Sequence, residues 1–302
     1  MFRPYRWLWC ILLSVSGLLA AIAPSAAHAA VTRSGPPTGV RFIGHTRLIH
    51  ASRFKLPATH LPQSHTVIHR SGNVTILATN NWAGYADVAC GKCALRYVTA
   101  NFPAPSINCA KVSAKSSNHY VSTWIGLDGI TDNTVEQLGV DGLCDKGTPV
   151  YYVWYEMYPQ GPHVFTISGF GPGDALSGNV YYNSHNRDWQ LTLIDLTRDV
   201  GFETDQACPS GQECRNADAE AITEDPGGAV SAGIYLADFG ATFYGRVKVT
   251  GRDGTRGTLA GSNSRHLWFP YRLQMYYKTH LMAYPGPLAA GTAFSVYWLA
   301  ST

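Results

Sequence analysis

The stretch W-Q-L-T-L-I, residues 189–194, sets apolar side chains at every second position. The stretches G-R-V-K-V-T (245–250) and A-F-S-V-Y-W (293–298) repeat this alternation, whereas apolar residues at helical spacing are hard to find. A period of two is typical of a β-strand with one buried face. Turn sequences such as G-P-G-D (171–174) separate the runs. Many short strands at such spacing predict an all-β domain, either an antiparallel sandwich or a barrel.

The first 29 residues have the features of a secretion signal. Arg3 and Arg6 precede a short apolar run, and Ala27 and Ala29 supply the small residues before a cleavage point at Ala30. A run this short, followed by such a cleavage site, disfavours a retained membrane helix. We therefore expect a secreted, extracellular protein with no membrane association once residues 1–29 are removed.

Charge divides the rest of the chain. The first acidic residue is Asp87, so 8 of the 23 basic residues lie before all 20 acidic ones, and the part from Asp87 onward has a formal charge of −5. Residues 30–77 also contain 5 of the 11 histidines. A basic tail can bind nucleic acid or anionic surfaces, but an exported chain with an acidic body favours a propeptide held partly by charge. A fall in pH would weaken that attraction by protonating histidines and carboxylates.

We accordingly expect residues 30–77 to be a propeptide that inhibits its own body intramolecularly. Residues 78–302 show no linker, repeat or low-complexity stretch, which indicates one domain. We expect this domain to be a monomer that does not bind nucleic acid.

Six cysteines follow the one in the signal segment, an even number in an exported chain. They predict three disulfides, with fifteen connectivities open. The pair in C-G-K-C (90–93) could suggest a metal site, but no second C-x-x-C or paired histidine accompanies it, so we expect no metal. The six are Cys90, Cys93, Cys109, Cys144, Cys208 and Cys214.

Two short segments offer a hydrolytic pair without serine, cysteine or metal. V-E-Q-L-G-V-D-G (135–142) contains the amide Gln137, and A-E-A-I-T-E-D-P (219–226) contains the carboxylate Glu224. A carboxylate can take a proton from water, and an amide N–H can stabilise an oxyanion. Three further motifs accompany them: N-W-A-G-Y (81–85), S-T-W-I-G-L-D-G (122–129) and V-W-Y-E-M-Y-P (153–159).

In order and spacing, these motifs resemble the glutamic peptidases known as eqolisins, peptidase family G1, from about residue 80 to the C-terminus. The resemblance implies a concanavalin A-like, lectin-like antiparallel β-sandwich whose curved sheet carries the substrate groove, and no cofactor. It implies that Gln137 and Glu224 are catalytic. The residues that it places at the substrate are Trp82, Trp124, Asp128, Tyr152 and Glu156, with Trp154 equally compatible with the core.

Tyr152 is a departure, because many family members have an aspartate at this position of the motif. It removes a carboxylate from the expected groove and so puts the subsite preference in question.

Strand geometry limits which carboxylates act together. In an extended segment Glu220 and Glu224 share a face, but at about 3.3 Å per residue they lie roughly 13 Å apart, too far to act on one bond. Glu136 and Gln137 face opposite ways, so only one of them looks into a given groove. The residues alone leave both choices open; the family pattern selects Gln137 and Glu224.

The expected activity is hydrolysis of polypeptide substrates by an acid endopeptidase. Glu224 would activate water and Gln137 would stabilise the oxyanion. Since an unperturbed glutamate titrates near about 4.3, hydrogen bonds or positive neighbours have to keep Glu224 ionised in stronger acid.

Two alternatives belong to other functional classes. Aromatic-rich lectin-like sheets can bind carbohydrate by stacking, and a retaining glycosidase would need two carboxylates about 5 to 5.5 Å apart. The chain lacks an E-x-D-x-x-E spacing on one strand, and it contains no G-x-S-x-G or H-E-x-x-H motif.

Overall fold

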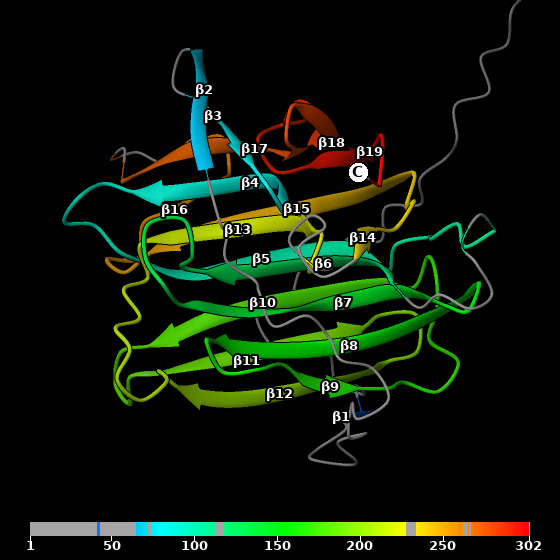
Figure 1. Cartoon of the computed structure of the whole chain (residues 1–302). Helices are drawn as coiled ribbons and strands as arrows, with labels where there is room; N and C mark the ends of the chain where they lie inside the picture. Colours follow the sequence, from blue (N-terminus) through cyan, green and yellow to red (C-terminus); the bar gives the residue numbers. More distant parts are fainter. Residues whose placement is uncertain are drawn as a thin grey trace, which may run out of the picture. The chain divides into compact units, whose positions relative to one another are not determined.

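The computed structural model describes residues 41–42, 65–71, 74–110, 112, 118–227, 234–261, 265 and 267–301. The predicted signal segment, 1–29, and most of the predicted propeptide, 30–77, lie outside the described residues. Every regular element within the described residues is a β-strand (Figure 1). Accordingly, none of the described segments forms a helix long and apolar enough to span a bilayer.

The strands form two layers, here called sheet I and sheet II. Sheet I contains β2 (His65–Ser71), β3 (Val74–Thr79), β4 (Trp82–Ala89), β6 (His119–Leu127), β7 (Val135–Asp145), β8 (Thr148–Tyr158), β9 (His163–Phe165), β13 (Asp218–Glu224), β14 (Tyr235–Leu236), β17 (Trp268–Tyr277), β18 (His280–Pro285) and β19 (Phe294–Trp298). Sheet II contains β1 (Arg41–Phe42), β5 (Leu95–Pro103), β10 (Ala175–Asn183), β11 (Asp188–Asp195), β12 (Val200–Ala207), β15 (Ala241–Gly251) and β16 (Arg256–Gly257).

Pairing in sheet I follows the order β2-β3-β17-β4-β13-β6-β7-β8-β9, and in sheet II the order β16-β15-β5-β10-β11-β12-β1. Neighbours are antiparallel except in the pairs β1–β12, β3–β17 and β6–β14. Strand β15 joins the layers, because its first residues pair with β19 and its later ones with β5. Figure 1 shows β13, β6, β7 and β8 lying side by side.

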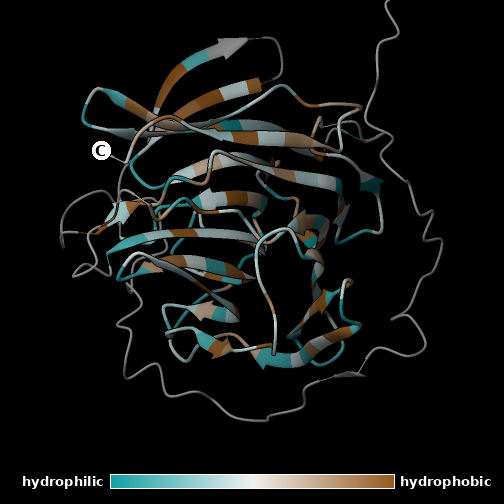
Figure 2. Cartoon of the chain, turned by 90° about the vertical axis from the view of Figure 1, so that its right-hand side faces the viewer, coloured by the Kyte–Doolittle hydropathy of each residue, from teal (hydrophilic) through white to brown (hydrophobic). Residues whose placement is uncertain are grey.

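A hydrophobic core fills the space between the two sheets. Val98 and Leu191 contribute from sheet II, and Ile125, Leu138 and Val153 from sheet I. The alternation that predicted strands is visible here: in β11, Trp189, Leu191 and Leu193 are buried in this core. Figure 2 shows the same alternation as brown and teal bands along single strands. The expected antiparallel β-sandwich is confirmed.

Sheet I also has an apolar cluster on its other face, which we call the outer face. Trp82, Trp124, Trp154, Tyr152 and Ile222 belong to it. This second cluster takes an apolar residue from each of the five sequence motifs, and their strands are buried on both faces.

Three disulfides join the six cysteines, which confirms their predicted number. The pairs are Cys90 with Cys93, Cys109 with Cys144, and Cys208 with Cys214. Cys90 and Cys93, the pair considered for a metal site, therefore form a disulfide with each other.

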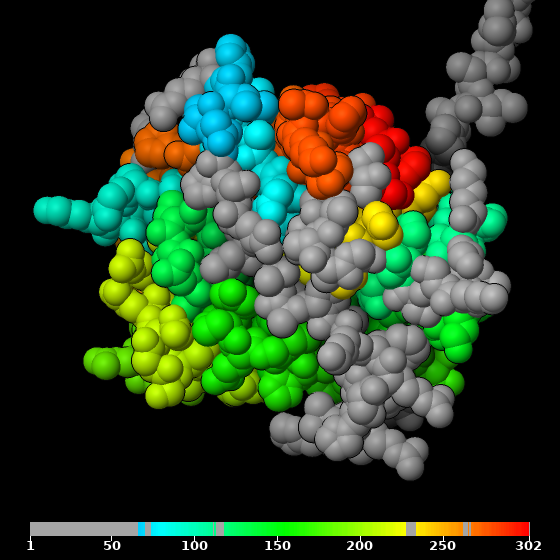
Figure 3. Space-filling view, viewed as in Figure 1, coloured from blue at the N-terminus to red at the C-terminus, as the bar shows by residue number. Residues whose placement is uncertain are grey.

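Three short strands fall in or across the predicted propeptide. Strand β1 pairs with the edge strand β12, and β3 pairs in parallel with β17. Leu77 of β3 is buried on the outer face. Figure 3 shows the cyan atoms of β2 and β3 beside the orange and red atoms of the C-terminal strands. The boundary set at residue 77 falls inside β3, and the cleavage point stays a prediction.

Candidate active site

Three rows of side chains cross the outer face of sheet I, because strand register places them opposite one another. The first row is Trp82, Glu224, Ser122, Asp141 and Tyr152; the second is Gly84, Ile222, Trp124, Gly139 and Trp154; the third is Ala86, Glu220, Gly126, Gln137 and Glu156. All five sequence motifs contribute to these rows. Gln137 and Glu224 thus lie on one face of one sheet, two strands apart.

The Gln137 amide is held by its cross-strand neighbour. Its Nε2 donates to Glu156 Oε2 over 2.7 Å, and both side chains are buried. Glu156 lies directly opposite on β8, where a cross-strand pair is close enough for this bond. Gln137 Oε1 has no hydrogen-bond partner among the described residues. The amide is therefore oriented through one N–H while its oxygen and other N–H stay available to a ligand.

The Glu224 carboxylate accepts two hydrogen bonds from other motifs. Trp124 Nε1 donates to Oε2 over 2.7 Å, and Asn81 Nδ2 donates to Oε1 over 3.4 Å. The Asn81 carbonyl also accepts the N–H of Asp225, over 2.8 Å. The turn between β3 and β4 therefore positions the end of β13.

Packing fixes the Trp124 ring. It meets Trp82 edge-to-face with ring centroids 4.8 Å apart. A Cβ on Gly139, the neighbour in the same row, would come within 2.6 Å of Trp124 Cβ. Glycine at this position thus allows the Trp124 backbone and Cβ to lie close to β7.

A second tryptophan and carboxylate repeat the arrangement. Trp154 Nε1 donates to Asp141 Oδ1 over 2.7 Å, and Ser122 Oγ donates to the same oxygen. This places Trp154 on the outer face rather than in the core between the sheets. Neither Asp141 nor Asn81 was among the predicted site residues. Asp141 shares a strand face with Gln137 four residues earlier, and Asn81 adjoins Trp82, so both carried a weak positional signal.

Glu220 shares a row with Gln137 but differs from Glu224 in its surroundings. Neither of its carboxylate oxygens has a hydrogen-bond donor among the described residues. Burial, followed by the nearby Asp218 charge, raises the pKa of Glu220 well above its usual range. A neutral Glu220 contrasts with a Glu224 that two donors surround.

Four of the five predicted substrate residues, Trp82, Trp124, Tyr152 and Glu156, lie together on the outer face. Asp128 lies apart from them. It follows the end of β6 with a positive φ of 72°, and its carboxylate accepts the backbone N–H groups of Asn216, over 2.7 Å, and Ala217. The positive φ ends the strand alternation at Asp128, so this residue does not continue the face of Trp124 where the resemblance placed it. Within the described residues, no group of three potential ligands could hold a metal ion.

A family model described as the peptidase A4 family matches residues 80–268. None of the curated proteins compared with the chain matches it. Among solved structures, scytalido-glutamic peptidase with a peptide-based transition-state analog has a TM-score of 0.59 at 22% identity, covering 73% of this chain and 98% of that one.

Two further structures are similar. SCP-B, a member of the eqolisin family in complex with the tripeptide Ala-Ile-His, has a TM-score of 0.56 at 22% identity, over 73% of this chain and 98% of that one. Aspergilloglutamic peptidase from Aspergillus niger has a TM-score of 0.50 at 21% identity, over 60% and 99%. These likenesses share the sandwich fold, and the family model spans more than half of the chain. The chain therefore belongs to the peptidase A4 family, the glutamic peptidases or eqolisins, and is a peptide hydrolase.

Proposed function

We propose that the protein is a secreted acid endopeptidase in which Glu224 is the general base and Gln137 stabilises the oxyanion. One observation carries this proposal. The Glu224 carboxylate accepts hydrogen bonds from Trp124 and Asn81 on the same sheet face that holds the oriented Gln137 amide.

The donors around Glu224 suit a base that works in acid. Hydrogen bonds donated to a carboxylate favour its charged form, and only the charged form can take a proton. Glu220, a second glutamate of β13 on this face, has no such donor and is neutral in acid. This contrast supports Glu224 on physical grounds, in addition to the motif.

Gln137 suits the oxyanion role because its amide is fixed before the reaction. One N–H is bonded to Glu156, so the second has a defined direction. A donor that needs no reorganisation stabilises developing charge best. An amide also stays a donor at any pH, whereas histidine would be charged in acid.

The reaction then follows in two proton transfers. Glu224 takes a proton from a bound water, and the water oxygen attacks the scissile carbonyl carbon. The carbonyl oxygen becomes an oxyanion that accepts a hydrogen bond from Gln137. Glu224 returns the proton to the amine as the C–N bond breaks, which regenerates the carboxylate.

The register requires both side chains to reach inward. Gln137 and Glu224 are two strands and four residues apart, roughly 16 Å between Cα atoms in a flat sheet. Trp124 lies in the row between them. This Cα separation is larger than the roughly 13 Å between Glu220 and Glu224 on one strand. The dyad therefore requires the Gln137 and Glu224 side chains to extend toward each other, with the water and the peptide carbonyl bound over the Trp124 row.

Replacing each proposed catalytic residue tests the dyad. Glu224→Gln should lower kcat/KM at pH 3 by about 10²- to 10⁴-fold, because it removes the base. Gln137→Ala should lower it by about 10²- to 10³-fold, because it removes the oxyanion donor. The assay is cleavage of denatured haemoglobin or casein in the presence of pepstatin.

Glu220→Gln is the matched control, on the same strand and face. It should keep activity at pH 3, since a neutral Glu220 and a glutamine are isosteric. Full activity of both Glu224→Gln and Gln137→Ala would contradict the mechanism. Sugar binding without proteolysis would favour the carbohydrate-binding alternative.

A further inference from the structure

Five carboxyl groups that the proposed mechanism does not use meet at one end of the β6–β7 hairpin. They come from three places: the end of β6 and its connection to β7, β7 itself, and the start of β13. All but Asp132 are completely buried. We call them the carboxyl cluster, which consists of Asp128, Asp132, Glu136, Asp218 and Glu220.

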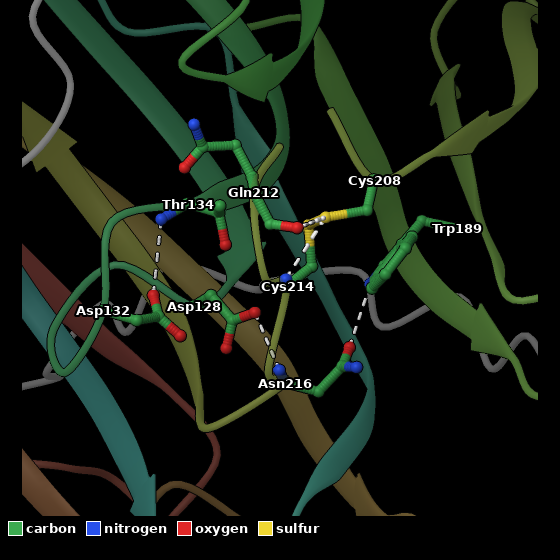
Figure 4. The surroundings of a disulfide bond; sticks show 8 residues. All are labelled: Asp128, Asp132, Thr134, Trp189, Cys208, Gln212, Cys214 and Asn216. Atoms are coloured by element: carbon green, nitrogen blue, oxygen red, sulfur yellow. Dashed lines mark hydrogen bonds between the residues drawn. A yellow bond between two sulfur atoms is a disulfide. The ribbon is translucent and has the colours of Figure 1, made fainter. Parts of the chain in front are cut away.

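The three aspartates accept hydrogen bonds from the backbone around them. Asp128 accepts N–H groups of the segment before β13, and Asp218 accepts the Ile130 N–H over 2.9 Å and the Thr131 hydroxyl over 2.7 Å. Asp132 accepts the Gly129 N–H over 3.1 Å. Figure 4 shows Asp128 and Asp132 beside the disulfide loop of Cys208 and Cys214. These bonds tie the β6–β7 connection to the start of β13.

Glu220 has no hydrogen-bond donor among the described residues, and Glu136 has only the nearby Thr134 hydroxyl, which favours its charged form less than burial disfavours it. All four of their carboxylate oxygens are buried. A proton on Glu136 can instead be donated to Asp128, and a proton on Glu220 to Asp218. Protonation therefore gives each glutamate a hydrogen bond to a neighbouring aspartate.

Charged groups on the adjoining elements do not neutralise the cluster. Arg215 is 55% exposed and bonded to Glu213, which raises its pKa more than Asp132 and Asp128 do. Asp87, in the row of Glu136 on the core side, is another buried carboxyl, and burial raises its pKa. On the outer side, the row of Glu220 continues to Gln137 and Glu156.

We propose that the carboxyl cluster is a pH-sensitive lock on the folded state. In its protonated form it joins β6, β7 and β13 through carboxyl-to-carboxylate hydrogen bonds. On ionisation, buried like charges push these strands apart. Gln137 follows Glu136 directly, and Glu224 lies on the strand of Glu220. Separation of β6, β7 and β13 would therefore move the two proposed catalytic residues apart.

The sign of the pH effect follows from proton binding. Carboxyl groups of an unfolded chain titrate near about 4. Burial and neighbouring carboxylates raise the pKa of Glu136 and Glu220 well above that, and the pKa of Asp132 to about 6. The folded state therefore holds more protons than the unfolded state above about pH 4, and stability falls as pH rises from there.

Thermal unfolding between pH 4 and pH 7 tests the lock, in a Glu224→Gln background that prevents self-digestion. Glu136→Gln and Glu220→Gln each place an amide N–H where the carboxyl proton was. Each should shift the pH at which half of the protein is unfolded, at fixed temperature, upward by about one unit. Asp132→Asn, at a partly exposed position, is a third variant that does not depend on tolerance of a core change.

Glu203→Gln is the control, since it removes one exposed carboxylate on β12. It should leave the midpoint unchanged. Unchanged midpoints in all three cluster variants would overturn the proposal. So would stabilisation of the parent at pH 7 by calcium chloride, because that would indicate a cation site. Unfolding is read without activity and all variants share one background, while proteolysis by the wild type and the Glu224→Gln variant is assayed separately, so failure of the lock and failure of the dyad are distinguishable.

Discussion

Trp124 connects the packing of the outer face to the carboxylate of Glu224. Its ring is held against Trp82, and its Nε1 donates to Glu224. Trp124→Phe keeps most of the ring and removes the donor. Since the donor favours the ionised carboxylate, we expect the acid limb of the pH–rate profile to move to higher pH, with about a tenfold loss of kcat/KM at pH 3.

The measurement is a pH profile of kcat/KM for Trp124→Phe. Trp268→Phe is the control, because this buried tryptophan loses a bond to the Thr258 carbonyl away from the outer face. An unmoved acid limb in Trp124→Phe would show that the indole N–H does not support the ionised base.

For single residues, the sequence predicts which side chains are candidates for catalysis better than it predicts their hydrogen-bond partners. The motif order was enough to select Gln137 and Glu224 as candidates. It could not say that Asn81 and Trp124 both reach Glu224, because those bonds depend on register between strands up to 143 residues apart. The resemblance placed Asp128 at the substrate, but its positive φ turns the backbone away from regular strand alternation.

A disulfide joins the connection between β5 and β6 to the end of β7. The disulfide between Cys109 and Cys144 spans 35 residues, whereas that between Cys208 and Cys214 spans six. In the chain-entropy model, replacing the first pair by serine should cost about 4 kcal/mol of unfolding free energy and the second about 2. Guanidinium unfolding at pH 4 in the Glu224→Gln background measures both. Equal losses, or a larger loss for the short loop, would contradict loop length as the cause.

Among the elements, alternating runs predicted strands well because that pattern is local. Residues 189–194, 245–250 and 294–298 are all strands in β11, β15 and β19. Pairing is not local. Strand β3 lies beside β17, nearly 200 residues later, with Thr75 opposite Tyr271. Nothing in the segment 74–79 alone indicates that partner, so a domain boundary drawn from composition fell inside a paired strand.

The expected propeptide, here called the leader, and the body of the chain differ in the sign of their charge. Residues 30–77 contain no acidic residue, and the part from Asp87 onward has a formal charge of −5. Strands β1 and β3 pair with β12 of sheet II and β17 of sheet I. At neutral pH, attraction to this leader and strand pairing should offset the repulsion within the carboxyl cluster.

Incubation of the precursor, residues 30–302, at pH 7 and pH 3 is the corresponding experiment. We expect the precursor to persist at pH 7, where the charges attract, and to be processed at pH 3, where the leader's histidines are charged and the body's carboxylates are neutral. The Glu224→Gln precursor should persist at both pH values if the protein processes itself, and at pH 7 it should unfold at a higher temperature than residues 78–302 alone. Equal persistence of the wild-type precursor at both pH values would contradict a charge-held leader, because the attraction would then not control its release.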